Sequence, residues 1–386
     1  MSYLYLEPEI LEKLFLRPTP LHDVFCILFR EYILQEKEKK TLILDTRRIL
    51  RNFQKLSFEV KDLSLSCSSS FEAFFLNVVT LFQLRKGEIP SSQLREFYFR
   101  KFSGSFSLSV KEKNFSALSR ASSSPFAIPE KVREFEDVYL SLLLEVPRFL
   151  IRDYGSFLSV SERKDILSSY WHKPVDFYLP SRKKEGLVRL EDGFLLSTKK
   201  EENDIRTFYP FEIALSSLSL PRLQPKVLLS SSCPDYAFFS LSSRLSSSLP
   251  VLDKARGLED DPASLDEKSL VCRFSPRDYD LVLLMGKDNR LSYNESQFLL
   301  PRLTEERLSS SKQSVLSSLR SYCGFVKKGG YLVYVSESVS SYETLLVRNA
   351  FFEEHEKEFE SVRSRFSLPS EVGSRAGYFM IFRRIV

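Results

Sequence analysis

Histidine is scarce in this chain of 386 residues, which has only His22, His172 and His355. The three lie far apart in the sequence, and no nucleophile-elbow glycine motif accompanies them, so no pattern favours a serine hydrolase. A triad assembled in space stays open, because spatial neighbours are invisible in a sequence. The chain also lacks a P-loop and a G-x-G-x-x-G sequence, so neither of these nucleotide-binding loops is indicated.

Cysteine is equally sparse. The five cysteines stand without a C-x-x-C pair or a cluster of histidines, at Cys26, Cys67, Cys233, Cys272 and Cys323. This scatter argues against a zinc site and against a disulfide framework. We therefore predict no bound metal, and reduced thiols in the cytoplasm.

Long apolar runs are missing as well. No run approaches the length of a membrane span, and the amino terminus has an acid at Glu7 and no basic region, so it does not read as a signal peptide. Hydrophobic residues make up 43% of the chain and aromatic residues 13%, which fits a folded protein of about two or three domains. The net charge of +5 suits contact with a phosphate backbone and suits an ordinary solvated surface equally well.

The stretch from Tyr279 to Val339 predicts two strands joined by a helix. It opens with the apolar run Leu281–Leu284 and closes with a glycine pair followed by a second apolar run ending at Val335. Between the runs, apolar residues recur at helical spacing, at Leu308, Val315, Leu316, Leu319 and Tyr322. This pattern indicates a βαβ unit in a sheet covered on both faces. In such sheets, ligands gather at the carboxyl ends of the strands.

This layout resembles the bacterial Sun/Fmu-type rRNA (cytosine-5) methyltransferases. In that family the first strand runs into Asp-Ala-Pro-Cys-Ser, and the second runs into Thr-Cys-Ser followed by Pro-Glu-Glu-Asn. Here the second strand runs into Ser336-Glu337-Ser338, with Tyr342-Glu343 after it. The resemblance implies a Rossmann-like class I methyltransferase domain, S-adenosyl-L-methionine as the family's cofactor, and ribosomal RNA as the partner.

The family's reactive residues are replaced. Its enzymes add a cysteine thiolate to C6 of cytosine, which makes C5 able to take the methyl group. This chain has Glu337 at the position of that nucleophile and Asp288 at the second cysteine, which assists product release; the acid that holds the base falls on Met285. A carboxylate is a much weaker nucleophile toward an unsaturated carbon than a thiolate. The comparison therefore predicts a catalytically inactive relative.

The cofactor loop departs from the family in the same way. The segment Lys226–Ala237 stands where the family has Leu-Asp-Leu-Cys-Ala-Ala-Pro-Gly-Gly-Lys, and Asp235-Tyr236 replaces both glycines. Those glycines let the backbone approach a ligand closely, so their loss speaks against cofactor binding in the usual manner. The positions that the resemblance assigns to cofactor binding are Cys233, Pro234, Asp235 and Asp253, the last as the acid for the ribose hydroxyls.

The first 145 residues predict an all-α domain. Three apolar stripes with i, i+3, i+4, i+7 spacing begin at Leu21, Phe71 and Phe135, and each should face a common helical core. The stretch from Phe82 to Pro90 resembles the helix end and Ile-Pro turn of the NusB-like RNA-binding domain found in many members of the family. Between about residues 105 and 129 the chain is polar and rich in serine, which predicts a surface loop.

Residues 146–220 resemble the family's small linker subdomain, which positions RNA. Tyr178 stands where the family has an arginine that helps hold RNA. Basic residues interleaved with aromatic ones suit single-stranded RNA. We assign RNA contacts to Arg182, Lys183, Lys184, Lys199 and Lys200. A small β-rich domain with a charged exterior explains the same pattern equally well.

Together these patterns predict a multidomain chain. Its parts are an all-α NusB-like domain over residues 1–145, a small α+β linker subdomain over residues 146–220, and an α/β Rossmann-like methyltransferase domain over residues 221–386. The first hypothesis is a cytoplasmic RNA-binding protein that has lost methyl transfer. The second is an S-adenosylmethionine-dependent RNA methyltransferase with changed chemistry, using Asp288 or Glu337 as a general base. The third is a protein-interaction scaffold.

Overall fold

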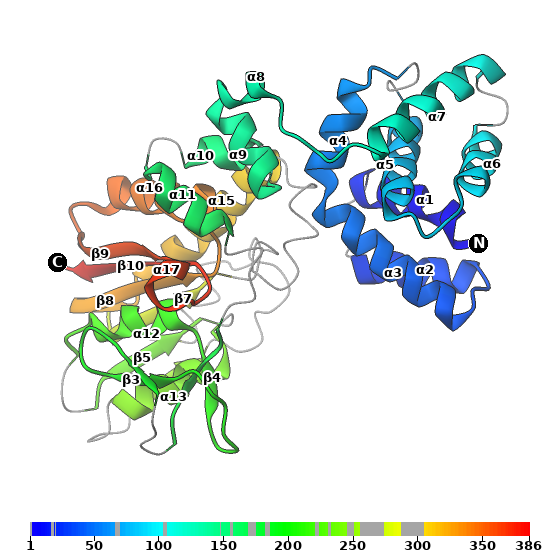
Figure 1. Ribbon diagram of the computed structural model, residues 1–386. Helices are drawn as coiled ribbons and strands as arrows, with labels where there is room; N and C mark the ends of the chain where they lie inside the picture. The colour runs from blue at the N-terminus through cyan, green and yellow to red at the C-terminus, as the bar shows by residue number, and fades with distance from the viewer. Residues whose placement is uncertain are drawn as a thin grey trace. The chain divides into compact units, whose positions relative to one another are not determined.

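The described residues fall into two compact units, one up to Arg152 and the other from Asp153 onward (Figure 1). The computed structural model describes residues 2–16, 19, 21–65, 70–102, 106–146, 148–154, 157–168, 175–181, 186–220, 224–230, 233–244, 251–254, 274–286 and 305–386. Within these ranges, no helix combines the length and the apolar character that crossing a membrane requires.

Every regular element described in the first unit is a helix, as the sequence predicts. Its elements are η1 (Ser2–Tyr5), α1 (Leu6–Leu16), α2 (Leu21–Glu31), α3 (Glu36–Arg51), α4 (Phe53–Asp62), α5 (Phe71–Lys86), α6 (Ser91–Lys101), α7 (Leu108–Ser122), α8 (Glu130–Arg133), α9 (Glu136–Leu144) and α10 (Arg148–Asp153), whose last residue begins the second unit.

Helix α5 lies at the centre of this unit and contacts α1, α4, α6 and α7. It begins at a serine cap, where the Ser70 hydroxyl accepts a hydrogen bond from the Ala73 backbone N–H at 3.1 Å. It ends at Gly87, whose φ of 68° is the left-handed conformation that glycine adopts without strain. The stretch from Phe82 to Pro90 is therefore a helix end and a turn into α6. Its likeness to a NusB-like domain stays a prediction.

The surface loop predicted between residues 105 and 129 is wrong, because α7 occupies most of that stretch. The Ser107 hydroxyl caps the helix by accepting from the Val110 N–H at 3.4 Å. Phe115 and Leu118, three residues apart, are 6% and 0% exposed and fix one face of α7 against the core. Serines that suggested a loop instead lie at the cap and on the outer face of a helix.

The third apolar stripe is only partly buried. Leu142 and Val146 are buried, but Phe135 is 58% exposed and Leu143 is 43% exposed. Helix α9 begins only at Glu136, so Phe135 does not lie on it and the expected spacing is broken.

The second unit mixes helices and strands. Its remaining elements are α11 (Val160–Ser168), β1 (Phe177–Leu179), β2 (Leu187–Arg189), β3 (Leu195–Ser197), β4 (Ile205–Thr207), α12 (Tyr209–Ser216), β5 (Lys226–Leu229), α13 (Asp235–Arg244), β6 (Val251–Lys254), β7 (Tyr279–Met285), α15 (Glu305–Cys323), β8 (Val326–Ser336), η5 (Ser341–Glu343), α16 (Leu345–His355), β9 (Phe359–Ser367), α17 (Pro369–Val372) and β10 (Gly377–Arg384).

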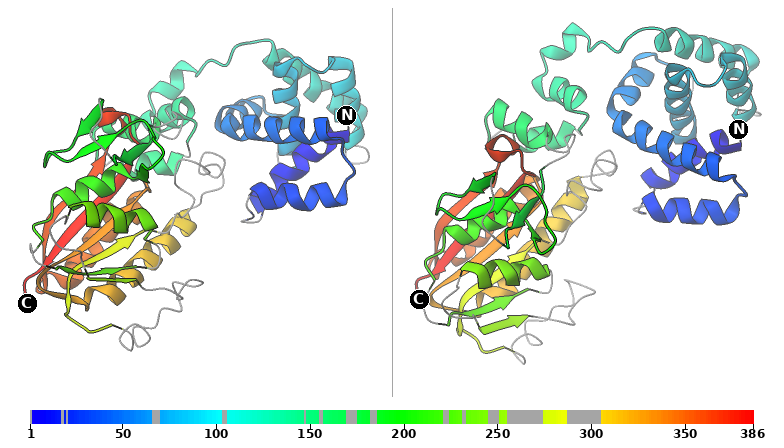
Figure 2. Two further views of the ribbon diagram at one scale, coloured as in Figure 1. Left: turned by 90° about the horizontal axis from the view of Figure 1, so that it is seen from below. Right: turned by 60° about the horizontal axis from the view of Figure 1, so that its bottom comes forward.

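The main sheet has six strands in the order β6-β5-β7-β8-β10-β9. Strands β6, β5, β7 and β8 are parallel, and β10 runs antiparallel to both β8 and β9. Helices cover both faces, with α12 and α13 (green) on one and α15 and α16 (yellow to orange) on the other (Figure 2). The predicted βαβ unit is confirmed as β7, α15 and β8, and the covered faces explain its continuous apolar strands.

A second, smaller sheet pairs four antiparallel strands in the order β2-β3-β1-β4. Its buried residues, such as Phe177 and Leu196, belong to the same hydrophobic cluster as Phe211 of α12 and Val333 of β8. The small sheet therefore packs on the main domain through a shared core. The boundaries at residues 145 and 220 stay predictions.

Candidate functional site

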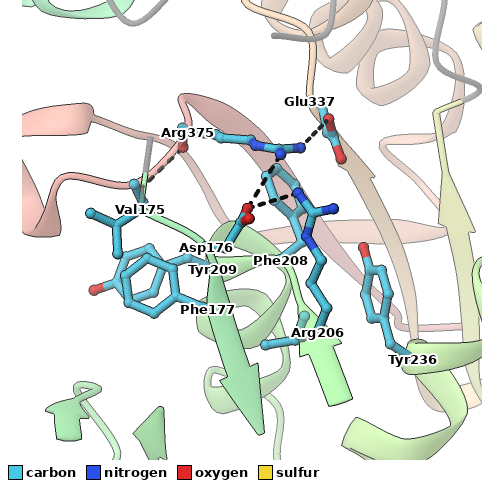
Figure 3. Close-up of a pocket in the computed structure, with 11 residues that line it drawn as sticks. Val175, Asp176, Phe177, Arg206, Phe208, Tyr209, Tyr236, Glu337 and Arg375 are labelled. Carbon is cyan, nitrogen blue, oxygen red and sulfur yellow. Dashed lines mark hydrogen bonds and ion pairs between the residues drawn. The ribbon is translucent and has the colours of Figure 1, made fainter. Parts of the chain in front are cut away.

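The topology of the main sheet predicts a binding site at the carboxyl ends of its parallel strands. From β5 the chain first adds β6 on one side and later β7 on the other, and such a reversal opens a crevice at the carboxyl ends of the two inner strands. Two residues that follow or end these strands meet there: the Tyr236 hydroxyl lies 3.5 Å from the Met285 sulfur. At this edge lies a cavity of about 300 Å³, lined by Val175, Asp176, Phe177, Arg206, Thr207, Phe208, Tyr209, Tyr236, Glu337, Ser374 and Arg375 (Figure 3).

Glu337 reaches the cavity because the loop after β8 is built on alternating serines. The Ser336 hydroxyl accepts from the Ser338 N–H at 3.0 Å, and the Ser338 hydroxyl accepts from the Ser340 N–H at 3.2 Å. These three serines are buried, whereas the intervening Glu337 lines the cavity. The serine side chains thus satisfy backbone N–H groups of the loop itself and hold residue 337 in place.

Arg375 meets Glu337 because of the register between β8 and β10. Strand β10 runs antiparallel to β8 with Tyr378 opposite Ser336, so residues just before β10 lie beside residues just after β8. The Arg375 Nη1 atom lies 3.7 Å from the Glu337 Oε2 atom. This is an ion pair at a separation longer than a hydrogen bond.

Asp176 joins the small sheet to this ion pair. It precedes β1, which pairs with β4 so that Tyr178 lies opposite Arg206. Asp176 Oδ1 accepts from Arg206 Nη2 at 2.7 Å and from Arg375 Nη2 at 3.3 Å. One carboxylate oxygen thus fixes both guanidinium groups at the cavity wall (Figure 3).

Aromatic rings form much of the remaining wall. Phe177 and Tyr209 pack with ring centroids 5.1 Å apart, and Tyr236 contacts Phe211 edge to face at 5.5 Å. Burial, and next the negative charge of Glu337, raise the pKa of the Tyr236 hydroxyl, which keeps it protonated. The cavity therefore combines two cations, two carboxylates and flat apolar rings, a set that can recognise a planar polar ligand.

The residues predicted to hold the cofactor lie near this edge but have structural contacts. Cys233 is 1% exposed, and its thiol donates to the Leu283 carbonyl at 3.3 Å. Pro234 precedes α13 and its carbonyl accepts from the Ala237 N–H at 3.0 Å, and Asp235 is the first residue of that helix. The prediction that these residues bind a cofactor stays untested.

Asp253 lies inside β6 rather than after it. Lys254 continues the strand, and the Asp253 carboxylate accepts a hydrogen bond from the Tyr279 hydroxyl at 2.6 Å. Met285 ends β7 and is 9% exposed. Asp288, the other residue that the resemblance aligns with a family cysteine, lies outside the described residues.

The predicted RNA-contact residues are only partly described. Lys199 and Lys200 are exposed in the turn after β3, where the Lys199 N–H donates to the Ser197 hydroxyl at 3.2 Å. Arg182, Lys183 and Lys184 lie outside the described residues. Tyr178, which the resemblance aligns with a family arginine, is the middle residue of β1.

The remaining thiols lie away from the cavity or outside the described residues. Cys323 ends α15, which places it before β8 and at the opposite edge of the sheet, and its thiol donates to the Arg320 carbonyl at 3.2 Å. Cys26 belongs to the helical unit, and Cys67 and Cys272 are outside the described ranges. Over the part of the chain that the structure describes, no group of three or more histidine, cysteine or acidic side chains could hold a metal ion.

Sequence reasoning missed the two arginines of the cavity. Arg206 and Arg375 are 169 positions apart (375 minus 206), and neither belongs to a motif. The signals near them were Glu337, noted at the nucleophile position, and Tyr236, noted as a glycine replacement; both side chains line the cavity.

Known proteins resemble this chain in structure rather than in sequence. No family model matches it, and no curated protein matches it. The solved structure of PH0851 superposes with a TM-score of 0.57 and 15% identity, covering 98% of this chain and 97% of that one. A methyltransferase homolog protein from Pyrococcus horikoshii gives a TM-score of 0.47 and 11% identity, covering 65% and 99%. NSun6 from Pyrococcus horikoshii gives 0.37 and 12%, covering 54% and 57%.

The similarity to PH0851 extends over nearly the whole length of both chains. The helical region followed by a mixed α/β sheet is therefore a fold that a known protein shares. The structural resemblance expected from the sequence is confirmed at the level of the fold.

Proposed function

We propose that this protein binds RNA through a methyltransferase-like fold and does not carry out the cytosine-5 transfer of the family it resembles. The observation that carries the proposal is Glu337, a carboxylate at the end of β8 that lines the cavity. It holds the position where that family has its nucleophilic cysteine. The serine loop keeps the position, while the side chain lacks the sulfur.

The chemistry of addition supports this reading. Attack on C6 of a pyrimidine favours a soft thiolate, and a carboxylate oxygen is a poor substitute. Among the described thiols, Cys233 is buried and donates into β7, and Cys323 lies at the other edge of the sheet. Neither can take the place of the missing nucleophile.

We infer that S-adenosylmethionine is not held in the family's manner. Tyr236 brings a ring to a position where the family has glycine, and the Asp253 carboxylate is engaged by Tyr279. These residues do not fit the family's cofactor site. The proposed function therefore involves no cofactor chemistry.

Binding to RNA is supported by charge and by the lining of the cavity. The chain carries a net charge of +5, and Lys199 and Lys200 are exposed in the unit that holds the cavity. Phosphate pairing from such lysines combines with base stacking on aromatic rings in single-strand recognition. The base stacking would come from the arginine and tyrosine side chains that line the cavity.

The test pairs a binding assay with a transfer assay. Purified protein is mixed with unmodified ribosomal RNA, and affinity is measured by filter binding at several salt concentrations; transfer is measured with S-adenosylmethionine labelled on the methyl group. We expect salt-dependent binding and no label in the RNA. Labelled RNA, with labelling abolished in Glu337→Ala, would refute the proposal. Absence of salt-dependent affinity would favour a protein-interaction scaffold instead.

A second candidate, methyl transfer with changed chemistry, rests on the position of Glu337 beside Tyr236 in the cavity. Transfer to an amino nitrogen or a hydroxyl needs a general base and no covalent thiolate step, and a carboxylate can act as that base. Calorimetric titration with S-adenosylmethionine decides the matter. Heat of binding at a single site would keep this candidate, and its absence at high protein concentration would remove it.

A further inference from the structure

The cavity at Glu337 has the dimensions and walls of a site for one flat ring. Its volume of about 300 Å³ is at the small end of ligand sites, enough for a base with the sugar and phosphate left outside. Arg206 and Tyr236 flank the space below Glu337 (Figure 3). We propose that this cavity binds an unpaired guanine of the RNA; the inference rests on the proposed function and names the base.

The two flanking side chains supply the stacking. A tyrosine ring and a guanidinium plane both stack on nucleobases. The guanidinium of Arg206 is held by its 2.7 Å hydrogen bond to Asp176, and the ring of Tyr236 is held by its edge-to-face contact with Phe211. A base that enters between them therefore meets two surfaces that are already positioned, which lowers the entropy lost on binding.

The carboxylate of Glu337 selects the base. Ionised carboxylates are acceptors only, with two oxygens side by side. Guanine presents two adjacent donors, N1–H and the 2-amino group, and can donate to both oxygens. Cytosine and adenine each present one amino donor next to a ring nitrogen acceptor, and uracil presents one N–H between two carbonyls. Those three bases would place an acceptor against a carboxylate oxygen, so guanine is favoured.

The neighbouring ion pair is compatible with this contact. Arg375 approaches Glu337 at 3.7 Å and is itself anchored on Asp176 at 3.3 Å. At this distance the arginine balances the charge of the carboxylate. The side chain of Glu337 is 28% exposed, so incoming donors can reach it. A thiol at the same position could not make a paired acceptor contact of this kind.

The experiment measures the affinity of short RNAs that differ in one base. Fluorescently labelled heptamers of uridine carry adenine, cytosine, guanine, uracil or hypoxanthine at the centre, and binding is followed by anisotropy. We expect the guanine heptamer to bind at least about tenfold more tightly than the adenine, cytosine and uracil ones. Hypoxanthine, which keeps N1–H and lacks the 2-amino group, should fall between them.

Variants assign the effect to the two side chains. Glu337→Gln keeps the shape and loses one acceptor, so the guanine preference should vanish while base-independent affinity persists. Glu191→Gln is the matched control, because Glu191 also pairs with arginines, at 2.7 Å to Arg363 and to Arg365, but does not line the cavity. Tyr236→Ala should weaken every heptamer, and Tyr236→Phe, which keeps the ring, should not.

The outcomes separate the two proposals. Equal affinity for all heptamers, or a guanine preference that survives Glu337→Gln, overturns the inference and leaves RNA binding standing. No binding of the heptamers or of ribosomal RNA overturns the proposed function, and the inference falls with it.

Discussion

At the scale of the residue, the proposed function depends most on position 337. Buried serines on either side hold the loop, and their hydrogen bonds do not depend on what side chain lies between them. A carboxylate there accepts hydrogen bonds and pairs with Arg375, whereas a thiolate would attack carbon. Under the proposed function, this backbone serves recognition in place of covalent catalysis.

Glu337→Cys gives a direct test of this placement. A thiol at a cavity wall should be alkylated by iodoacetamide in the folded protein, while Cys233, at 1% exposure, should react at least about tenfold more slowly. Peptide mass spectrometry after timed alkylation measures both rates. We expect no methyl transfer from this variant. The resemblance aligns Met285 with the acid that holds the cytosine base in the family, and a methionine side chain cannot replace that acid. Equal alkylation of Cys233 and of the introduced thiol would contradict the assigned burial.

Glu7 is the second residue whose surroundings decide its chemistry. It is 0% exposed in the helical unit, and burial raises its pKa to about 8 although Gln83 donates to both carboxyl oxygens at 2.9 Å. Gln83 also donates to Asp45 at 3.2 Å, and Lys86 pairs with Asp45 at 2.8 Å. The negative charge of Asp45 adds to the effect of burial.

This pKa predicts stability that declines as the pH rises. Between the ordinary pKa of 4.5 and the folded value of about 8, the folded protein keeps a proton that the unfolded chain releases. The free energy of unfolding therefore falls with pH in this window, by at most about 1.4 kcal/mol per unit. Urea unfolding at several pH values should show a shallower decline in Glu7→Gln. The exposed control Glu96→Gln should behave as wild type, and an unchanged slope in Glu7→Gln would exclude the mechanism.

At the scale of the element, α7 shows how a helix can be hidden in a polar sequence. Only a few apolar residues form its buried face, and its many serines give the segment the composition of a loop. We expect Leu118→Ala, at a side chain 0% exposed, to lower the free energy of unfolding by roughly 2–5 kcal/mol. Leu108→Ala, at a side chain 63% exposed, should change it by less than about 0.5 kcal/mol. Equal effects in chemical denaturation would show that α7 does not pack as described.

The contact between Gly286, just after β7, and the side chains of β8 gives a second test at this scale. A Cβ at Gly286 would lie 2.7 Å from the Tyr334 hydroxyl oxygen and 3.1 Å from the Ser336 hydroxyl, so no side chain fits at the end of β7. Gly286→Ala should destabilise the protein by roughly 1–3 kcal/mol. Adding Tyr334→Phe removes the nearest atom and should recover part of the loss. Independent, additive effects in this double-mutant cycle would contradict the contact.

At the scale of the whole molecule, RNA affinity should depend on exposed lysines of the second unit. Each lysine that neutralises a phosphate contributes about one unit to the slope of log affinity against log salt. Lys199→Glu with Lys200→Glu should weaken binding and lower the slope by about 2. The matched control reverses two other exposed lysines of this unit, Lys328 and Lys357, and should retain most of the affinity. Equal losses in both double variants would remove the assigned contact.

The sequence was sufficient to predict the local helices and strands. Apolar runs at Leu281–Leu284 and up to Val335, with helical spacing between them, indicated the βαβ unit that β7, α15 and β8 form. The helical first unit followed from spacing in the same way. These signals are short-range, because strand and helix periods repeat within about ten residues, and a residue such as Gly87 shows its role from its neighbours alone.

Only the tertiary structure decided which side chains share the cavity. Asp176, Arg206 and Arg375 meet because β1 pairs with β4 and β10 pairs with β8, and the register of such pairs is set by packing across the whole core. The sequence by itself determined that residue 337 is a glutamate and carries no sulfur. It could not show that an arginine from just before β10 and a tyrosine from α13 would surround that residue, because contacts between distant segments arise only when the sheets close.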